Sequence, residues 1–440
     1  RDRFGIKPLI YAYDENRLIY GSELKAILAY DIDKNIDKQA LAQYFRHTYI
    51  PAPRTILKSC KKLLPGKIIE ITNGEVNIES YYQFYPTKKS DDNYQKAKQK
   101  VNELFHESVK KRLVSDVPLG TFLSGGVDSS IVSAVAKKYK LDLNTFSIGF
   151  PDEPIFDESK YAQKVAKHIG SKHHCFNVTN KNLYQNLEDI LDYFDEPMAD
   201  SSAINVYILA KETKQNVTVS LSGDGADELF SGYNKHQALY FSLQNNISNS
   251  LIKKFGHFAK WLPSSRNSKI GNLGRQVDKL YTGLNKSIDD RYLEWASFME
   301  ENNVRELTNQ NINNNYLEKV SSNQDDFNNF LFYDFKLVLE NDMLRKVDIM
   351  SMANSLEVRT PFLDHELVDY VFSLPSEYKI NKRNRKKILK ESFRNELPEE
   401  IFTRKKHGFE VPLKKWFNNE MKLFLENEIF NNSSLVKEGI

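Results

Sequence analysis

A short apolar segment that runs directly into a glycine- and serine-rich loop decides the fold. The stretch reads Leu119-Gly120-Thr121-Phe122-Leu123-Ser124-Gly125-Gly126-Val127-Asp128-Ser129-Ser130. Its apolar part predicts a strand, and a helical pattern begins near Ile131. Two adjacent glycines let the backbone take a positive φ and approach a ligand closely. The last two serines fall in the first turn of the helix, where free N–H groups attract anions, so the segment predicts a phosphate-binding loop.

This loop differs from two common nucleotide-binding motifs. It lacks the lysine and the second glycine of G-x-x-x-x-G-K-[ST], and it does not follow G-x-G-x-x-G. A carboxylate, Asp128, stands beside the expected phosphates, and that arrangement requires a cation between them. Mg²⁺ fits, because it binds one or two carboxylates together with phosphate oxygens and water. The residues alone also allow a plain serine- and glycine-rich turn that caps a helix.

A second strand of the same kind ends in acidic residues. The β-rich run 217–221 leads into Ser222-Gly223-Asp224-Gly225-Ala226-Asp227-Glu228. In an open parallel sheet such strand ends face one crevice. Asp227 is then a candidate for the second carboxylate that binds the metal, and Asp224 is a candidate for the group that acts on the nucleophile's proton. An acidic helix N-terminus that complements the helix dipole is the alternative interpretation.

The order of the expected elements indicates an α/β domain with a doubly wound parallel sheet. Strands and helices alternate along the chain, with strands at 119–123, 145–150, 173–178 and 217–221 and helices at 94–113, 131–139, 160–169 and 205–213. Beyond about residue 230 the pattern is mainly helical. Residues 1–82 are mostly β, with hairpins expected at 9–21 and 68–79. We therefore predict a first domain over 1–82, a polar linker over 83–93 and a second domain over 94–440.

Composition excludes several classes of protein. The 440 residues contain 62 Lys and Arg against 59 Asp and Glu, a near balance that argues against a protein that coats nucleic acid. With Cys60 and Cys175 as the only cysteines, a disulfide framework, a CxxC pair and a cysteine-based zinc site are excluded. We find no membrane-length apolar run and no export signal, so we expect a soluble cytoplasmic protein with no nucleic-acid or membrane partner.

The two ends of the chain suggest a longer protein. Position 1 is Arg rather than Met, and the hairpin that follows needs further strands to be stable. The last residues stop without a helix cap or a polar tail. We expect a fragment that is truncated at both ends.

Taken together, the motifs resemble the glutamine-dependent asparagine synthetase family, whose members are N-type ATP pyrophosphatases. The resemblance covers nearly the whole chain, in family order, at 1–9, 22–26, 51–56, 63–67, 115–118, 124–130, 195–197, 346–353 and 357–364. The segments Lys346–Ala353 and Glu357–Asp364 are the most specific. The resemblance implies a PP-loop fold like that of the adenine nucleotide alpha hydrolases, with a helical C-terminal extension. It also implies that the later part of an Ntn-type glutaminase domain precedes this fold.

The resemblance further implies roles for individual residues. ATP would be bound by Leu123, Ser124, Gly125, Gly126, Asp128, Ser129, Ser130, Ile148, Ser222 and Gly223, of which Leu123 and Ile148 contact adenine and ribose. Mg²⁺ would be held by Asp128 and Asp227. Asp224 matches an acidic position implicated in the ammonia step, and Lys406 matches a lysine that stabilises charge at the α-phosphorus. The residue pattern alone does not separate Lys406 from Lys405 or Lys386.

The implied activity is ATP-dependent amidation of L-aspartate to L-asparagine through β-aspartyl-AMP, with release of AMP and pyrophosphate. Ammonia would come from glutamine in the full-length enzyme. Because the family's glutaminase nucleophile is an N-terminal cysteine, while Cys60 and Cys175 are interior, this chain alone is not expected to hydrolyse glutamine. The sequence also allows another acceptor carboxylate, from a sugar acid or a peptide or natural-product precursor.

Two other classes of function fit the sequence less well. An enzyme of this fold that acts on transfer RNA would need a sulfur-carrying cysteine pair or a strongly basic surface. A catalytically silent relative would be expected to have lost the loop glycines or the metal carboxylates, and all are present. The sequence leaves a homodimer open and does not decide the oligomeric state.

Overall fold

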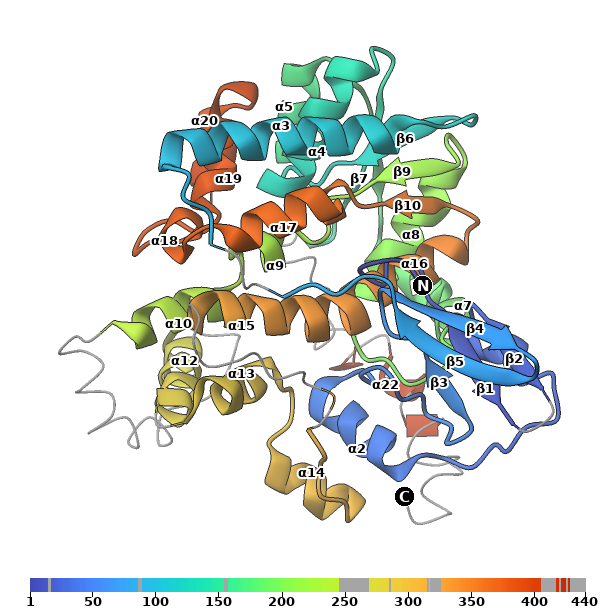
Figure 1. The fold of residues 1–440 in the computed structure, drawn as a ribbon. Coiled ribbons are helices and arrows are strands. Elements are labelled where there is room, and N and C mark those ends of the chain that lie inside the picture. Colours follow the sequence, from blue (N-terminus) through green and yellow to red (C-terminus); the bar gives the residue numbers. More distant parts are fainter. Residues whose placement is uncertain are drawn as a thin grey trace.

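Figure 1 shows the computed structural model, in which a mostly β N-terminal part lies beside a larger α/β part. The structure describes residues 1–404 apart from 15–16, 86–88, 154–156, 245–268, 285, 315 and 317–325, and beyond them only 417–418, 421–424 and 426–427. Among these residues, none of the helices combines the length and the apolar character that crossing a bilayer requires.

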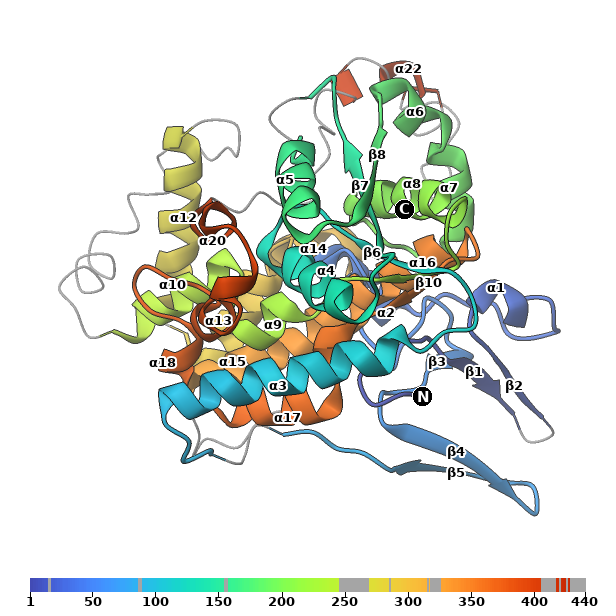
Figure 2. The same ribbon diagram turned by 90° about the horizontal axis from the view of Figure 1, so that it is seen from above.

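The N-terminal part contains two small antiparallel sheets. Strands β1 (Ile10–Tyr13), β2 (Leu18–Gly21) and β3 (Cys60–Lys62) form one sheet in the order β2-β1-β3. The hairpin of β4 (Lys67–Thr72) and β5 (Glu75–Ser80) forms the other and extends away from the body of the molecule (Figure 2). Two helices complete this part, α1 (Leu24–Ile27) and α2 (Lys38–His47). Both predicted hairpins are confirmed.

A five-stranded parallel sheet forms the centre of the larger part. Its order is β10-β9-β6-β7-β8, from β6 (Leu119–Phe122), β7 (Asn144–Gly149), β8 (Lys172–Asn177), β9 (Val219–Leu221) and β10 (Glu357–Arg359). The four strands expected from the sequence are present. The fifth, β10, was not predicted, because it has three residues of which only Val358 is buried.

Helices cover both faces of this sheet, as Figure 2 shows. On one face lie α3 (Tyr94–Leu113), α4 (Val127–Tyr139) and α5 (Ser159–Ile169), whose apolar side chains join one core cluster. On the other lie α8 (Ser202–Lys214) and α16 (Arg345–Met352), which pack with β7 in a second cluster. The expectation of a doubly wound α/β fold is therefore confirmed. Helix α4 begins at Val127, earlier than the predicted start near 131, so its first turn lies within the glycine-rich loop.

The remainder of the described chain is mainly helical, which confirms the prediction for the segment beyond about residue 230. It comprises α6 (Asn180–Gln185), α7 (Leu187–Tyr193), α9 (Ala226–Phe230), α10 (Asn234–Leu243), α12 (Lys269–Leu284), α13 (Ile288–Ala296), α14 (Glu301–Thr308), α15 (Asp326–Asp334), α17 (His365–Ser373), α18 (Ser376–Lys379), α19 (Lys387–Ser392), α20 (Glu399–Thr403) and α22 (Lys422–Phe424), with 3₁₀ turns at Pro361–Leu363 and Arg394–Glu396.

A π-helix over Phe335–Leu344 joins α15 to α16. Such helices are rare and occur often at functional sites. This one contacts the N-terminal part: Glu340 forms an ion pair of 3.1 Å with Arg1, and the Asn341 side chain accepts a hydrogen bond of 2.8 Å from the backbone N–H of Ala52. The π-helix therefore lies at the border between the two parts of the molecule.

Candidate functional site

The loop after β6 is shaped by its own serines and glycines. Gly125 has φ +74°, and a Cβ there would lie 2.6 Å from the backbone nitrogen of Ala162 on α5. The hydroxyls of Ser124 and Ser129 lie 3.0 Å apart, and the N–H of Gly126 donates to the Ser124 hydroxyl at 3.3 Å. These contacts hold the loop at the N-terminus of α4, as an anion-binding turn requires.

The loop after β9 packs directly against the first loop. Its N–H at Ser222 donates to the carbonyl of Arg359 on β10 at 2.9 Å, which fixes the end of the strand. At Gly223, an added Cβ would lie 3.0 Å from both the Asp128 Cβ and the Ser129 nitrogen. A side chain at this position would require its neighbours to shift, so glycine suits the close approach. The two strand ends identified in the sequence therefore meet.

Asp128 and Asp227 converge on one ammonium group, that of Lys386. Its Nζ lies 2.6 Å from each carboxylate oxygen of Asp128 and 2.7 Å from Oδ1 of Asp227. The Lys386 side chain is 6% exposed. Gly232 provides the necessary space, because a Cβ there would lie 1.7 Å from Asp227 Oδ1 and 2.2 Å from Lys386 Cε.

Electrostatics keep this cluster charged. Burial acts to lower the pKa of Lys386, but the carboxylates of Asp128 and Asp227 outweigh it and raise the pKa above its ordinary value. Lys386 is one of the three lysines that the sequence did not separate. Nothing in its neighbourhood of basic residues marked Lys386 as a buried lysine.

The residues present fit a shared Mg²⁺. Two carboxylates from different strand ends already point at a single cation, and the glycine at 232 leaves room around it. Across the described ranges, no group of three or more His, Cys, Asp or Glu side chains is arranged to hold a metal. Two protein carboxylates are what Mg²⁺ takes when phosphate oxygens and water complete its shell.

Asp224 lies beside these carboxylates and accepts a hydrogen bond of 2.7 Å from the Ser222 hydroxyl. Burial raises the pKa of Asp224, although the Ser222 hydroxyl and the Lys346 ammonium act against it. Lys346, on α16, was singled out in the sequence only as part of a family segment. Lys346 is distant from Asp224 in the sequence, but in the fold its charge acts on the pKa of Asp224. No local sequence pattern predicts this interaction.

The other predicted site residues are only partly brought together. Leu123 is fully buried, and its N–H donates to the carbonyl of Phe146 at 2.8 Å, whereas Ile148 lies on the neighbouring strand β7. The two side chains belong to different core clusters. The Ser130 hydroxyl is buried. Lys406 and Lys405 lie outside the described residues.

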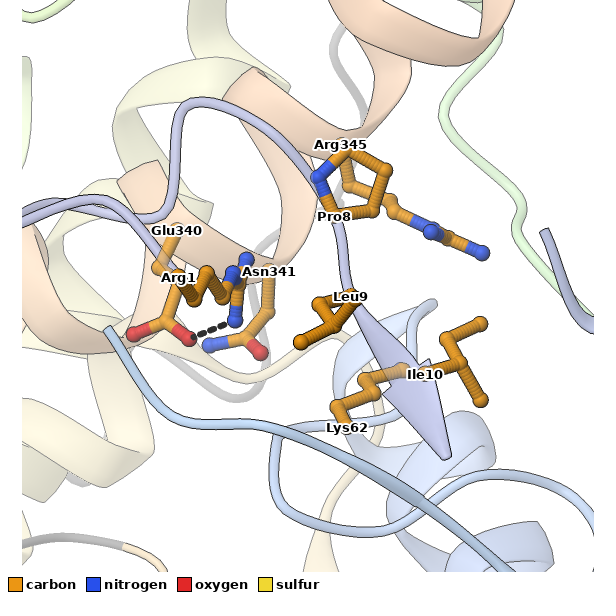
Figure 3. A pocket seen from close by; sticks show the side chains of 8 residues that line it. All are labelled: Arg1, Pro8, Leu9, Ile10, Lys62, Glu340, Asn341 and Arg345. Carbon is orange, nitrogen blue, oxygen red and sulfur yellow. Dashed lines mark hydrogen bonds and ion pairs between the residues drawn. The ribbon is translucent and has the colours of Figure 1, made fainter. Parts of the chain in front are cut away.

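A pocket lies at the border between the two parts of the molecule. Figure 3 shows the paired side chains of Arg1 and Glu340 near Leu9 and Ile10 of the N-terminal part. Lys62 and Arg345 also line it, and each has an acidic partner in the segment before α8: Lys62 pairs with Glu196, and Arg345 with Asp195 at 2.9 Å. Charged pairs thus surround the pocket on both sides of the border.

Comparisons with known proteins agree with this architecture. The asparagine synthase family model matches residues 100–440, and the glutamine amidotransferase domain model matches residues 1–82. Asparagine synthetase [glutamine-hydrolyzing] 1 of Bacillus subtilis is 35% identical over 98% of this chain and 68% of its own length. Asparagine synthetase [glutamine-hydrolyzing] 3 of the same organism is 31% identical over 93% of this chain and 64% of its own length. The chain thus spans about two thirds of the length of these relatives.

Similarity to solved structures is weaker. The NH3-dependent NAD synthetase from Campylobacter jejuni matches 44% of this chain and 98% of its own, at 12% identity and a TM-score of 0.22. A score this low carries no argument about fold or function.

Proposed function

Because the chain belongs to the asparagine synthetase family of ligases, we propose that it catalyses ATP-dependent amidation of L-aspartate to L-asparagine. The reaction would proceed through β-aspartyl-AMP and release AMP and pyrophosphate. The observation that carries this proposal is the convergence of Asp128 and Asp227, from two strand ends, on one cation position.

The geometry suits a reaction in which pyrophosphate leaves. When an acceptor carboxylate attacks the α-phosphorus, the site must hold the leaving group rather than the transferred one. We assign the β- and γ-phosphates to the loop of Ser124, Gly125, Gly126, Ser129 and Ser130, at the N-terminus of α4. Mg²⁺, held by Asp128 and Asp227, would neutralise charge on the departing pyrophosphate. Lys386 would add a second positive charge beside it.

Asp224 is the proposed proton acceptor of the second half-reaction. Ammonia that attacks the acyl-adenylate must lose a proton, and a carboxylate within the site can take it. The raised pKa of Asp224 suits this role, because a stronger base accepts the proton more readily. Its hydrogen bond from Ser222 fixes the direction in which the carboxylate points.

Glutamine is the proposed ammonia donor in a protein that includes the rest of the amidotransferase domain. Residues 1–82 match the glutamine amidotransferase domain model, so ammonia released by that domain would cross the border between the two parts. The pocket between Leu9, Ile10 and the π-helix lies on that border. It is a candidate segment of the passage.

Free ammonia allows the proposal to be tested on this chain. With Mg²⁺-ATP and ammonium chloride, we expect pyrophosphate and AMP to form when L-aspartate is added. If the β-carboxylate carries ¹⁸O, one labelled oxygen should appear in AMP. Formation of ADP and phosphate would contradict the proposal. Pyrophosphate release with a uronic acid and not with L-aspartate would favour another acceptor carboxylate instead.

The lysine at the α-phosphorus needs its own test. We assign Lys406 to this role and Lys386 to the pyrophosphate. In Lys406→Ala, ¹⁸O transfer into AMP should slow while ATP affinity changes little, and Lys405→Ala serves as the matched control. Equal losses in the two variants would remove the assignment.

A further inference from the structure

A second buried lysine–carboxylate cluster lies away from the proposed phosphate site. The Lys346 side chain is 2% exposed, and its ammonium forms an ion pair with Asp200, which precedes α8. On the other side, Lys346 Nζ lies 3.9 Å from Oδ1 of Asp342, on the π-helix. This distance is too long for a hydrogen bond, so the ammonium contacts Asp200 directly and interacts with Asp342 only through its charge.

The cluster has an excess of negative charge and an unused acceptor atom. Asp200 and Asp342 contribute two carboxylates against the one cation, and Asp224 also acts on Lys346. The Asp342 side chain is 15% exposed, and its Oδ1 is buried with no hydrogen-bond partner in the part of the chain that the structure describes. Burial raises the pKa of Asp342 to about 7; the charges of Lys346 and Lys235 oppose this, whereas Asp200 reinforces it through its charge and a side-chain hydrogen bond. A further cation would remove this imbalance.

Tyr49 supplies an independent observation from the N-terminal part. Its side chain is 4% exposed, and its hydroxyl is buried without a partner among the residues described. The segment that carries Tyr49 bonds to both sides of the cluster: the Thr48 carbonyl accepts from the N–H of Ala199, next to Asp200, and the N–H of Ala52 donates to the side chain of Asn341, next to Asp342. In agreement with this placement, the Asp342 carboxylate adds to the effect of burial in raising the pKa of the Tyr49 hydroxyl. Buried tyrosine hydroxyls normally have a hydrogen-bond partner, so this one indicates a missing polar group.

The cluster is well placed for a substrate of the proposed reaction. The N–H of Ala199 donates to the carbonyl of Thr48 at 2.8 Å, which holds the Asp200 segment against the N-terminal part. Asp200 also accepts a hydrogen bond of 2.9 Å from the N–H of Ser202, at the start of α8. The charges of Lys346 and Asp224 each act on the pKa of the other group, so the cluster is coupled electrostatically to the loop that follows β9.

We propose that Asp342 and Tyr49 bind the α-ammonium group of the acceptor amino acid, beside the Lys346–Asp200 ion pair. An ammonium has three N–H donors and one positive charge, which matches two unused acceptors in a negatively charged cluster. This inference rests on the proposed function and adds the feature that selects the acceptor. An α-amino acid with a side-chain carboxylate is accepted, and a dicarboxylate without an ammonium is rejected.

The test is direct binding to the full chain, so that turnover is not required. L-Aspartate and succinate are titrated calorimetrically in the presence of Mg²⁺ and a non-hydrolysable ATP analogue. We expect the wild-type chain to bind L-aspartate and not succinate. Asp342→Asn should weaken L-aspartate binding about tenfold or more, because a hydrogen bond to a charged group is lost, and should leave the affinity for the ATP analogue unchanged.

Two further variants keep the test decisive. Tyr49→Phe removes only the hydroxyl and should weaken L-aspartate binding about threefold, even if Asp342→Asn does not fold. Asp142→Asn, at a side chain that is 86% exposed, is the matched control and should change nothing.

Three results would overturn the inference. Unchanged L-aspartate affinity in Asp342→Asn and Tyr49→Phe would overturn the inference and leave the proposed function in place. Equal loss of L-aspartate and ATP-analogue binding would also overturn the inference, because the effect would not be specific to the acceptor. Binding and turnover of a uronic acid but not of L-aspartate would overturn the proposed function and the inference together.

Discussion

The two buried lysine clusters have the same composition but different geometry. Lys386 contacts both of its carboxylates, at 2.6 Å from Asp128 and 2.7 Å from Asp227. Lys346 contacts Asp200, whereas Asp342 lies 3.9 Å away. The first cluster is closed, so a ligand cation must displace or share the ammonium. The second retains an unused carboxylate oxygen, so it can take up a further cation without losing an ion pair.

Position in the fold explains the difference. The first cluster lies where two parallel strands end, and its carboxylates come from the first turns of α4 and α9, which follow two loops in direct contact. The second combines the segment before α8 with a π-helix, and the N-terminal segment that carries Tyr49 forms hydrogen bonds with both. In our account the closed cluster of Lys386 binds the phosphates together with a metal ion that neutralises their charge. The open cluster of Lys346 selects the acceptor amino acid.

The largest effect should come from the closed cluster. Asp128→Asn or Asp227→Asn removes one carboxylate from the proposed metal and disturbs Lys386. We expect pyrophosphate release at saturating L-aspartate to fall about 100-fold or more, as for other electrostatic groups in active sites. The initial rate measures this, with Asp142→Asn as the control. A change of less than about threefold in both variants would remove the closed cluster from catalysis.

A smaller loss should follow when the closed cluster is displaced but not removed. Gly232→Ala places a Cβ within 1.7 Å of Asp227 Oδ1, so the carboxylate must shift. We expect pyrophosphate release to fall about 10- to 100-fold, because misplacement by about 1 Å has effects of this size. Gly21→Ala is the control, since the nearest atom to its Cβ would lie at 3.6 Å. Full activity in Gly232→Ala would show that the spacing of the cluster does not matter.

The open cluster should have its own pH signature. The pKa of Asp342 is about 7 in the folded chain and near 3.8 in the unfolded chain. Between these values the unfolded chain has lost the proton and the folded chain keeps it. Stability therefore falls as pH rises, by up to about 1.4 kcal/mol per pH unit. Asp342→Asn removes this contribution.

Thermal unfolding at pH 5 and pH 7 measures that contribution. The decrease in Tm between the two values should be smaller in Asp342→Asn than in the wild-type chain, by about 2 °C or more. Asp142→Asn should behave like the wild type. An identical pH dependence in Asp342→Asn would mean that the carboxylate is not held in a perturbed state.

The sequence was most informative where chemistry is carried by a contiguous segment. Residues 124–130 and 222–228 each follow a strand, so their convergence at one sheet edge could be predicted, and Asp128 and Asp227 do meet. The strand periodicity likewise predicted four strands of the parallel sheet. In contrast, β10 is too short to produce a periodic signal.

The missed residues depend on long-range contacts. Lys386 lies in a strongly basic segment, and only the tertiary fold decides that this lysine is buried between two carboxylates. Asp342 lies in a π-helix, whose hydrogen-bond pattern has no clear sequence signature. Tyr49 reaches the same cluster from another part of the chain.

The most direct test of the central claim is a double-mutant cycle on Mn²⁺-dependent binding of the ATP analogue. Affinities are measured for the wild type, Asp128→Asn, Asp227→Asn and the double variant. If both carboxylates hold one ion on one triphosphate, each single variant should lose most of the metal-dependent affinity, and the double variant should be no weaker than the weaker single variant. Losses that multiply in the double variant would mean that the two carboxylates act independently, which would contradict the account.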